Sequence, residues 1–176
     1  MRIAVVIDMQ PGFSAAHDKM LRKRIANRIR RHNECGDRVI VVEYKDHGNT
    51  YTGIMNAALE NRHFIDDETG QGCVVEKSDD AGGLEVLKAA YRMNIVEPFR
   101  FVLMGVNTNC CVLDTARDIL RIDPNASVVL PVGCMKCPHD DHVPEPHAPP
   151  TAAMVEIFCK DFEGRATRIW DEDEIG

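Results

Sequence analysis

The chain has 176 residues, enough for one domain with a sizeable core, and its 44% hydrophobic and 28% charged residues are ordinary for a globular protein. Its 21 Lys and Arg against 28 Asp and Glu give a net charge of −7, which disfavours nucleic acid or an anionic membrane as the main partner. No apolar segment has the length that a signal peptide or a membrane span needs, so we expect a cytoplasmic protein that does not associate with membranes.

Apolar runs rich in β-branched residues alternate with amphipathic segments along the chain. Residues 2–8 (RIAVVID) form the first run, which predicts a strand buried on both faces. Residues 18–35 follow with apolar positions among many Arg and Lys, which predicts a helix, and Gly36 is its expected C-terminal cap. Further strands are predicted at 38–44, 72–77, 99–106, 126–132 and 165–170, and further helices at 53–61, 82–94, 110–121 and 150–158.

This alternation predicts an α/β fold, a doubly wound, Rossmann-like parallel sheet of about five to six strands with helices on both faces. We assign the whole chain, residues 1–176, to this single domain because no internal repeat and no low-complexity linker divides it. Two segments stand outside the alternation. Residues 137–150 are rich in proline and polar residues and predict a loop, and residues 171–176 are an acidic tail.

Reactive side chains come at the ends of the predicted strands, where open parallel sheets bind their ligands. Asp8 ends the first strand, Lys45 follows the second, Lys77 ends the third, and Cys110 and Cys111 follow the fourth within GVNTNCCVLDTARD. A helix N-terminus and a nearby ammonium both favour the thiolate form of a cysteine. A carboxylate within reach can take the thiol proton and later return it to a leaving group. An acid, a lysine and a thiol together predict acyl transfer with a cysteine nucleophile.

Three motifs occur in an order and spacing that resemble the isochorismatase-like cysteine hydrolases, which include the nicotinamidases. VVIDMQPGF resembles the first-strand motif of the family, VVEKSDDAGG the segment with its lysine, and GVNTNCCVLDTARD its nucleophile motif. The resemblance covers nearly the whole chain. It implies Asp8 as general base and acid, Lys77 as the supporting cation and Cys111 as the nucleophile. Cys111 is preferred to Cys110 because it directly precedes the valine of the motif.

The same resemblance implies the rest of the site. The backbone N–H groups of Asn107 and Cys111 would form an oxyanion hole. Phe13 would line the substrate pocket, although core packing explains a phenylalanine there equally well, and Gln10 is expected to hold the backbone of a turn. The implied reaction is hydrolysis of a C–N amide bond of a small molecule through a thioester on Cys111, with no required cofactor. The resemblance also implies a homo-oligomer.

The chain departs from the nicotinamidases in its histidines. Those enzymes carry a metal site of one Asp and three His after the second strand. Here Asp46 and His47 are present, and His63 is the only other histidine before Lys77. The incomplete set disfavours nicotinamide as the substrate and makes Asp46 and His47 ordinary loop residues in our interpretation.

A second group of residues has the chemistry of a zinc site. It consists of Cys134, Cys137, His139, His142 and His147, which lie within fourteen residues of each other. The alternative interpretation of this segment is a loop, stiffened by prolines, that covers the active site. The sequence favours the loop and leaves zinc as the less expected outcome.

Three other functions stay open at this point. The first is a catalytically silent binding or assembly module on the same fold. The second is an isochorismatase-type vinyl-ether hydrolase, which the thiol disfavours because those enzymes lack a nucleophilic cysteine. The third is a redox protein that uses Cys110–Cys111 or Cys134–Cys137, although no thioredoxin-like pattern is present. We expect Cys110 to be a packed or half-exposed thiol, and no disulfide framework among the seven cysteines.

Overall fold

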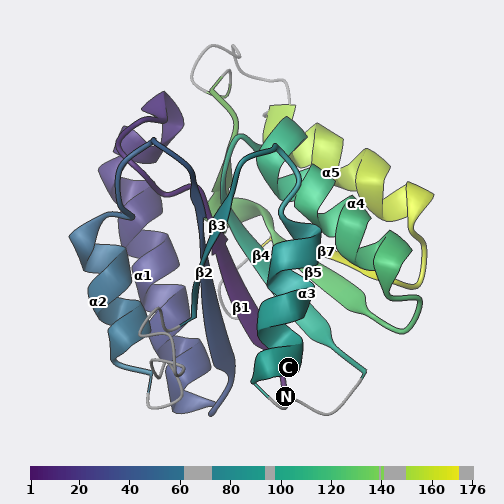
Figure 1. Cartoon of the computed structure of the whole chain (residues 1–176). Helices are drawn as coiled ribbons and strands as arrows, with labels where there is room; N and C mark the ends of the chain where they lie inside the picture. The colour runs from purple at the N-terminus through teal and green to yellow at the C-terminus, as the bar shows by residue number, and fades with distance from the viewer. Residues whose placement is uncertain (62–72, 94–97, 139, 141–149, 171–176) are drawn as a thin grey trace.

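Parallel strands form one twisted sheet at the centre of the protein (Figure 1). A computed structural model describes residues 1–61, 73–93, 98–138, 140 and 150–170. In this part of the chain the strands are β1 (Ile3–Ile7), β2 (Arg38–Tyr44), β3 (Val74–Lys77), β4 (Arg100–Val106), β5 (Ser127–Pro131), β6 (Met135–Lys136) and β7 (Ala166–Ile169). Their order is β3-β2-β1-β4-β5-β7, with β6 paired to the last two residues of β4.

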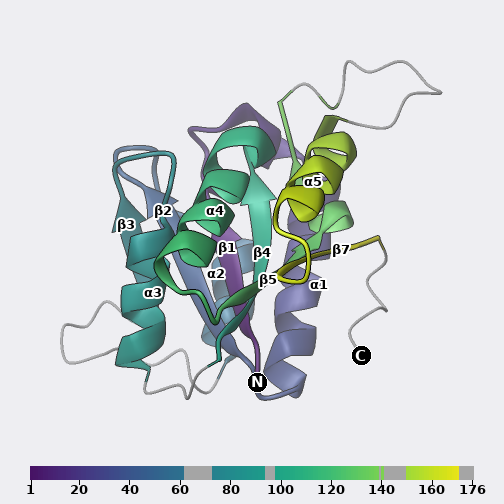
Figure 2. The same ribbon diagram turned by 90° about the vertical axis from the view of Figure 1, so that its right-hand side faces the viewer.

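Helices cover both faces of the sheet. They are α1 (Lys19–Glu34), α2 (Thr52–Leu59), α3 (Gly83–Arg92), α4 (Leu113–Ile122) and α5 (Pro150–Asp161). In Figure 1, α1 and α2 lie on one side of the strands, and α3, α4 and α5 lie on the other. Figure 2 shows the second group in front of the sheet. The predicted doubly wound α/β fold is therefore confirmed.

Alternate residues of β1 pack into two separate hydrophobic cores, as expected for a strand with both faces covered. Ile3, Val5 and Ile7 pack with the helices α3, α4 and α5, whereas Ala4 and Val6 pack with α1 and α2. Because every residue of β1 is buried, its sequence is a continuous apolar run.

Local signals set the ends of the first helix. The Asp18 side chain accepts hydrogen bonds from the backbone N–H groups of Met20 and Leu21, at 2.8 and 3.0 Å, and so caps the N-terminus of α1. Gly36 follows the helix with φ +72°, a left-handed conformation that favours glycine. The C-terminal cap expected from the sequence is confirmed.

The structure corrects two expectations about the elements. The sheet has seven strands within the described residues, against about five to six predicted, and β6 is the strand that the sequence analysis missed. With only two residues, β6 has no alternation to recognise. The helix predicted at 110–121 also begins differently, because a π-helical turn, Thr108–Val112, precedes α4. No helix among the described residues is both long and apolar enough to cross a membrane.

Candidate active site

The carboxyl ends of β1 and β4 form the centre of the candidate site. The chain runs outward from β1 to β3, returns to β4 and runs outward again to β7, so the winding direction changes between these two neighbours. Such a switch point is where open α/β sheets bind ligands. Gly105 lets the strands pass closely, since a Cβ at this residue, with φ +141°, would lie 2.0 Å from the carbonyl oxygen of Ile7.

Asp8 follows β1 and is completely buried. Its backbone has φ +57°, an uncommon conformation for a residue other than glycine, and its N–H donates to the carbonyl of Val42 at 3.0 Å. Neither carboxylate oxygen receives a hydrogen bond of good geometry from the described residues. Because a buried carboxylate is costly to keep ionised, Asp8 is a candidate for chemistry rather than packing.

Lys77, the last residue of β3, reaches over the end of β2 to Asp8. Its Nζ lies 3.0 Å from Oδ2 of Asp8, and both side chains are buried. The ammonium donates its hydrogen bond to the backbone carbonyl of Asp80 at 2.6 Å. Gly82 leaves room for the lysine, since a Cβ there would stand 3.1 Å from Lys77 Cδ. The structure therefore joins the predicted acid and cation in one buried ion pair.

Cys111 lies in the π-helical turn after β4 and is 2% exposed. The turn starts from Asn107, whose backbone has φ +54°. The Asn107 side-chain amide, at Nδ2, lies 3.9 Å from the Cys111 sulfur, and Oδ1 of Asp80 lies 4.0 Å from it. The Asp8 carboxylate also interacts with this thiol. Asp8, Lys77 and Cys111 thus meet in one place, as the sequence predicted.

The three charged or ionisable groups change each other's proton affinity. Burial raises the pKa of Asp8 above its usual range, although Lys77 and the Cys111 thiol act in the opposite direction. Burial, followed by the negative charge of Asp8, raises the pKa of the Cys111 thiol to about 12, and Lys77 only partly offsets this. Lys77 favours the thiolate, as expected, but burial and Asp8 outweigh it in the resting site. A pKa this high keeps the Cys111 thiol protonated at neutral pH, beside the Asp8 side chain.

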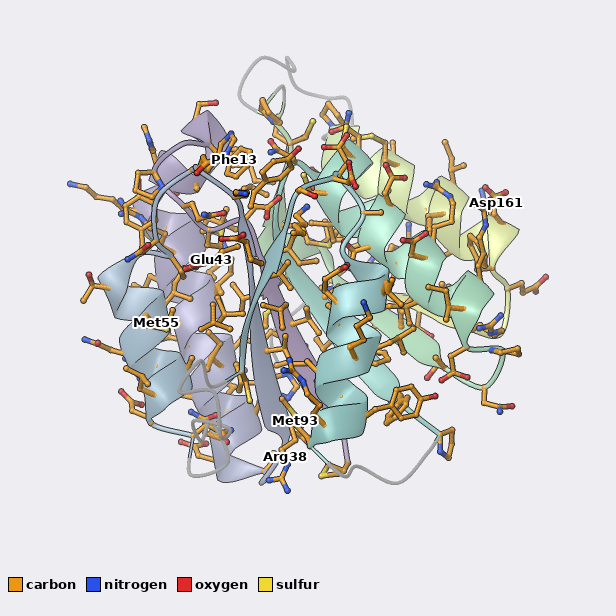
Figure 3. The ribbon with its side chains drawn as sticks, in the orientation of Figure 1. Phe13, Arg38, Glu43, Met55, Met93 and Asp161 are labelled. Atoms are coloured by element: carbon orange, nitrogen blue, oxygen red, sulfur yellow. The ribbon has the colours of Figure 1, made fainter. Side chains whose placement is uncertain are left out.

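Gln10 and Phe13 shape the turn beside Asp8. Gln10 donates from Nε2 to the carbonyls of Tyr44 (2.9 Å) and Gly48 and accepts from the Tyr44 N–H at 2.7 Å, which confirms that it holds backbone. Phe13 lies at the end of the molecule opposite Arg38 (Figure 3). One face of its ring stacks on His47, with centroids 4.7 Å apart. Its role in lining a substrate pocket stays a prediction.

The oxyanion hole also stays a prediction, but the structure adds a donor near it. The backbone N–H groups of Asn107 and Cys111 belong to the same turn, at the carboxyl end of β4. The sequence analysis assigned only the backbone of Asn107, whereas its side-chain amide is the group that points at the sulfur.

Sequence reasoning missed two further groups. Asp80 was quoted within a motif but given no role, and it contacts both Lys77 and Cys111. The second group is a buried network, in which the Thr151 hydroxyl contacts the Thr108 hydroxyl at 3.2 Å and donates to Asp140 at 2.6 Å. This network ties the start of α5 to the nucleophile turn. Local sequence carries no signal for such a contact between distant segments.

The described residues contain no group of three or more His, Cys, Asp or Glu that could hold a metal ion. Asp46 is exposed, and Nδ1 of His47 is hydrogen-bonded to the carbonyl of Lys45 at 2.8 Å. Within the described residues, these two do not belong to any larger group of possible metal ligands. The remaining histidines of the two candidate groups, at positions 63, 139, 142 and 147, lie outside the described residues, so zinc stays a prediction.

All seven cysteines are free thiols. Cys134 and Cys137 are buried, and Cys110 is half-buried and packs against the core beneath α3, α4 and α5. Cys110 therefore has the packed environment that the sequence analysis expected. Burial raises the pKa of its thiol, and the carboxylates of Asp80 and Asp114 raise it further.

The sequence model of the isochorismatase domain matches residues 2–144, which include every residue of the site described so far except Thr151. The chain belongs to the isochorismatase family. No curated protein sequence matches it. The family assignment confirms the resemblance seen in the three motifs.

Solved structures agree with this assignment at the level of the fold. The N-carbamoylsarcosine amidase of Thermoplasma acidophilum is 18% identical, with 99% of each chain covered and a TM-score of 0.65. The pyrazinamidase/nicotinamidase of Streptococcus mutans is 15% identical, with 96% of this isochorismatase-family chain and 100% of that one covered and a TM-score of 0.68. A ribonuclease of Caenorhabditis elegans is 17% identical, with 98% and 78% covered and a TM-score of 0.64. At these identities, the likeness shows the fold alone.

Proposed function

We propose that this member of the isochorismatase family is a cysteine amidohydrolase that cleaves a C–N amide bond of a small molecule. The observation that carries the proposal is the meeting of Asp8, Lys77 and Cys111 from three separate strand ends, with the ion pair at 3.0 Å and the thiol against the buried acid. Family membership supports a hydrolase, and the amidases with the same fold support the C–N bond.

The reaction begins with proton transfer from Cys111 to Asp8. The thiolate attacks the carbonyl carbon, and the oxyanion develops near the N–H groups of Asn107 and Cys111. Asp8 then returns the proton to the departing nitrogen, which leaves as ammonia or an amine, and a thioester remains on Cys111. Asp8 next takes a proton from water, whose oxygen attacks the thioester carbon. The C–S bond breaks, the acid leaves, and Asp8 returns the proton to the Cys111 sulfur.

Lys77 has a charge-balancing role in this scheme. Before the attack, Asp8 carries the negative charge, and after the proton transfer, the sulfur carries it. The ammonium, held by the carbonyl of Asp80 at 2.6 Å, stays beside the pair in both states. Because the site is buried, this fixed cation stabilises the charge more than it would in water. The proposal needs no cofactor and includes no metal.

A small-amide screen with mass spectrometry of the intact protein tests the proposal. We expect one or more amides to release ammonia or an amine and to leave a thioester adduct that hydroxylamine removes. The adduct and the activity should disappear in Cys111→Ala and persist in Cys110→Ala, the neighbouring thiol serving as the matched control. The screen also reports on the substrate itself.

The alternatives give different results in the same experiment. Amide or vinyl-ether cleavage that survives Cys111→Ala would discard the covalent mechanism and favour the isochorismatase-type hydrolase. A Cys111 that forms no adduct with any amide and resists alkylation would favour the silent binding or assembly module. A homo-oligomer and a cytoplasmic location remain proposals that rest on the resemblance.

A further inference from the structure

Asp80 occupies the exposed side of the candidate nucleophile. It lies between β3 and α3, and its backbone carbonyl accepts the hydrogen bond of the Lys77 ammonium at 2.6 Å, which fixes its position. Its carboxylate oxygen Oδ1 lies 4.0 Å from the sulfur of Cys111. Asp8 is buried whereas Asp80 is exposed, so the sulfur interacts with one buried and one exposed carboxylate.

The charges around the sulfur do not cancel. Lys77 forms an ion pair with Asp8 at 3.0 Å, whereas the Asp80 carboxylate forms no ion pair with the described residues. Asp80 raises the pKa of both neighbouring thiols, Cys110 and Cys111, as a negative charge close to each of them must. Because Asp80 is exposed and its Oδ1 lies 4.0 Å from the sulfur, its charge acts on a substrate that reaches the sulfur.

We propose that Asp80 is a specificity-determining residue that favours amides with a protonated amine near the scissile carbonyl over amides with a carboxylate there. The inference rests on the proposed role of Cys111 and names the substrate class of that site. The physical basis is the 4.0 Å separation between the Asp80 oxygen and the sulfur, because a group bonded close to the reacting carbon comes equally close to the carboxylate. One unit charge about 4 Å away, in surroundings as polar as water, changes a rate by about fivefold.

Charge-matched thiol reagents test the inference without a known substrate. The probes are methanethiosulfonates with a trimethylammonium-ethyl, a sulfonato-ethyl or a methyl group. Peptide mass spectrometry measures the labelling rate of Cys111, and the reaction of each reagent with free 2-mercaptoethanol corrects for intrinsic reactivity. We expect the cationic reagent to label Cys111 at least about fivefold faster than the anionic one, with a smaller ratio at high salt.

Asp80→Asn is the deciding variant, because it removes the charge and keeps the backbone carbonyl that binds Lys77. The cation-to-anion ratio should fall by about 25-fold in Asp80→Asn, because the lost charge changes the two rates by about fivefold each, in opposite directions. Asp79→Asn, which removes the same charge from the exposed neighbouring residue, should keep most of the ratio. If Asp80→Asn keeps the wild-type ratio, or if the wild type prefers the anionic reagent, the inference is wrong.

The outcomes separate this inference from the proposed function. Labelling of Cys111 without charge preference would overturn the role of Asp80 and leave the nucleophile intact. No labelling of Cys111 by any of the three reagents would count against the nucleophile, and the inference would fail with it. With active enzyme, the ratio of kcat/KM for 3-aminopropanamide to that for succinamate should fall in Asp80→Asn and stay high in Asp79→Asn.

Discussion

Replacing Asp8 by asparagine should make the Cys111 thiol more acidic while it removes the hydrolytic activity. Burial and the negative charge of Asp8 raise the pKa of this thiol, whereas Lys77 lowers it. An asparagine keeps the shape of the side chain and removes its charge. The lysine, 3.0 Å from the former carboxylate, then acts on the thiolate with only burial and the smaller effect of Asp80 against it.

The size of the effect follows from the charges. At pH 8, a thiol with a pKa of about 12 is ionised in about one molecule in ten thousand. A single charge within about 4–6 Å shifts a pKa by about 1–3 units, so the variant should contain about 10 to 1,000 times more thiolate. Amide hydrolysis should fall by about 10²- to 10⁴-fold, because the proton acceptor of both steps is missing.

Ultraviolet absorbance of the thiolate, measured against pH, reports this equilibrium directly. Each spectrum is corrected with Cys111→Ala in the same background, because the other cysteines also absorb when ionised. Circular dichroism confirms that the variant is folded. A thiol pKa that stays the same or rises in Asp8→Asn would show that the sulfur does not sense the carboxylate, and the proposed proton transfer would be refuted.

Four other outcomes follow from the same contacts. Lys77→Met should lower the free energy of unfolding, measured by chemical denaturation, by about 3–5 kcal/mol because it leaves the Asp8 charge buried and unpaired. The double variant Asp8→Asn/Lys77→Met should lose less unfolding free energy than the two single variants together. The kcat/KM for an uncharged amide should rise with pH through the raised pKa of Asp8, since the carboxyl is protonated below this pKa and accepts no proton. Ionisation of the Cys111 thiol should not lower kcat/KM below about pH 12. A bell-shaped profile centred near neutral pH would contradict this. Thr151→Val should cost about 1–3 kcal/mol of unfolding free energy, measured by thermal denaturation, because it leaves buried hydrogen-bonding groups unpaired. Asn107→Gly should leave the free energy of unfolding unchanged or raise it by about 1 kcal/mol, since glycine suits a backbone with φ +54°. The kcat should fall, because glycine lacks the side-chain amide beside the sulfur. An unchanged kcat would exclude a role for that amide.

Much of the fold could be predicted because hydrophobic pattern and burial agree along the chain. The run at 2–8 is continuous because both faces of β1 are covered, and Asp18 and Gly36 have the cap chemistry expected at the ends of α1. The two-residue strand β6 escaped prediction, because its pairing with β4 depends on tertiary contact alone.

The residues of the candidate site could be predicted from the sequence, but their protonation states could not. Parallel strands bring their carboxyl ends to one edge, so Asp8, Lys77 and Cys111 could be placed together from the motifs. Charge and helix position alone favoured a thiolate, but burial outweighs both in the folded protein. The depth of a side chain depends on the packing of several segments around it. For the same reason, the contact of Asp80 with the sulfur became visible only in the structure.

Backbone strain gives a separate reason to place chemistry at this edge of the sheet. Within the described residues, the non-glycine positions with a left-handed backbone are Asp8, Asp46 and Asn107, which follow β2 and the two strands at the switch point. A chain that needed only to turn could use glycine there, as it does at Gly36 and Gly48. Asp8 adds a second cost, since its buried carboxylate lacks a well-aligned donor. A packing role explains neither cost, whereas a carboxylate that must exchange a proton with a neighbouring thiol explains both, and this favours an enzyme over a silent module.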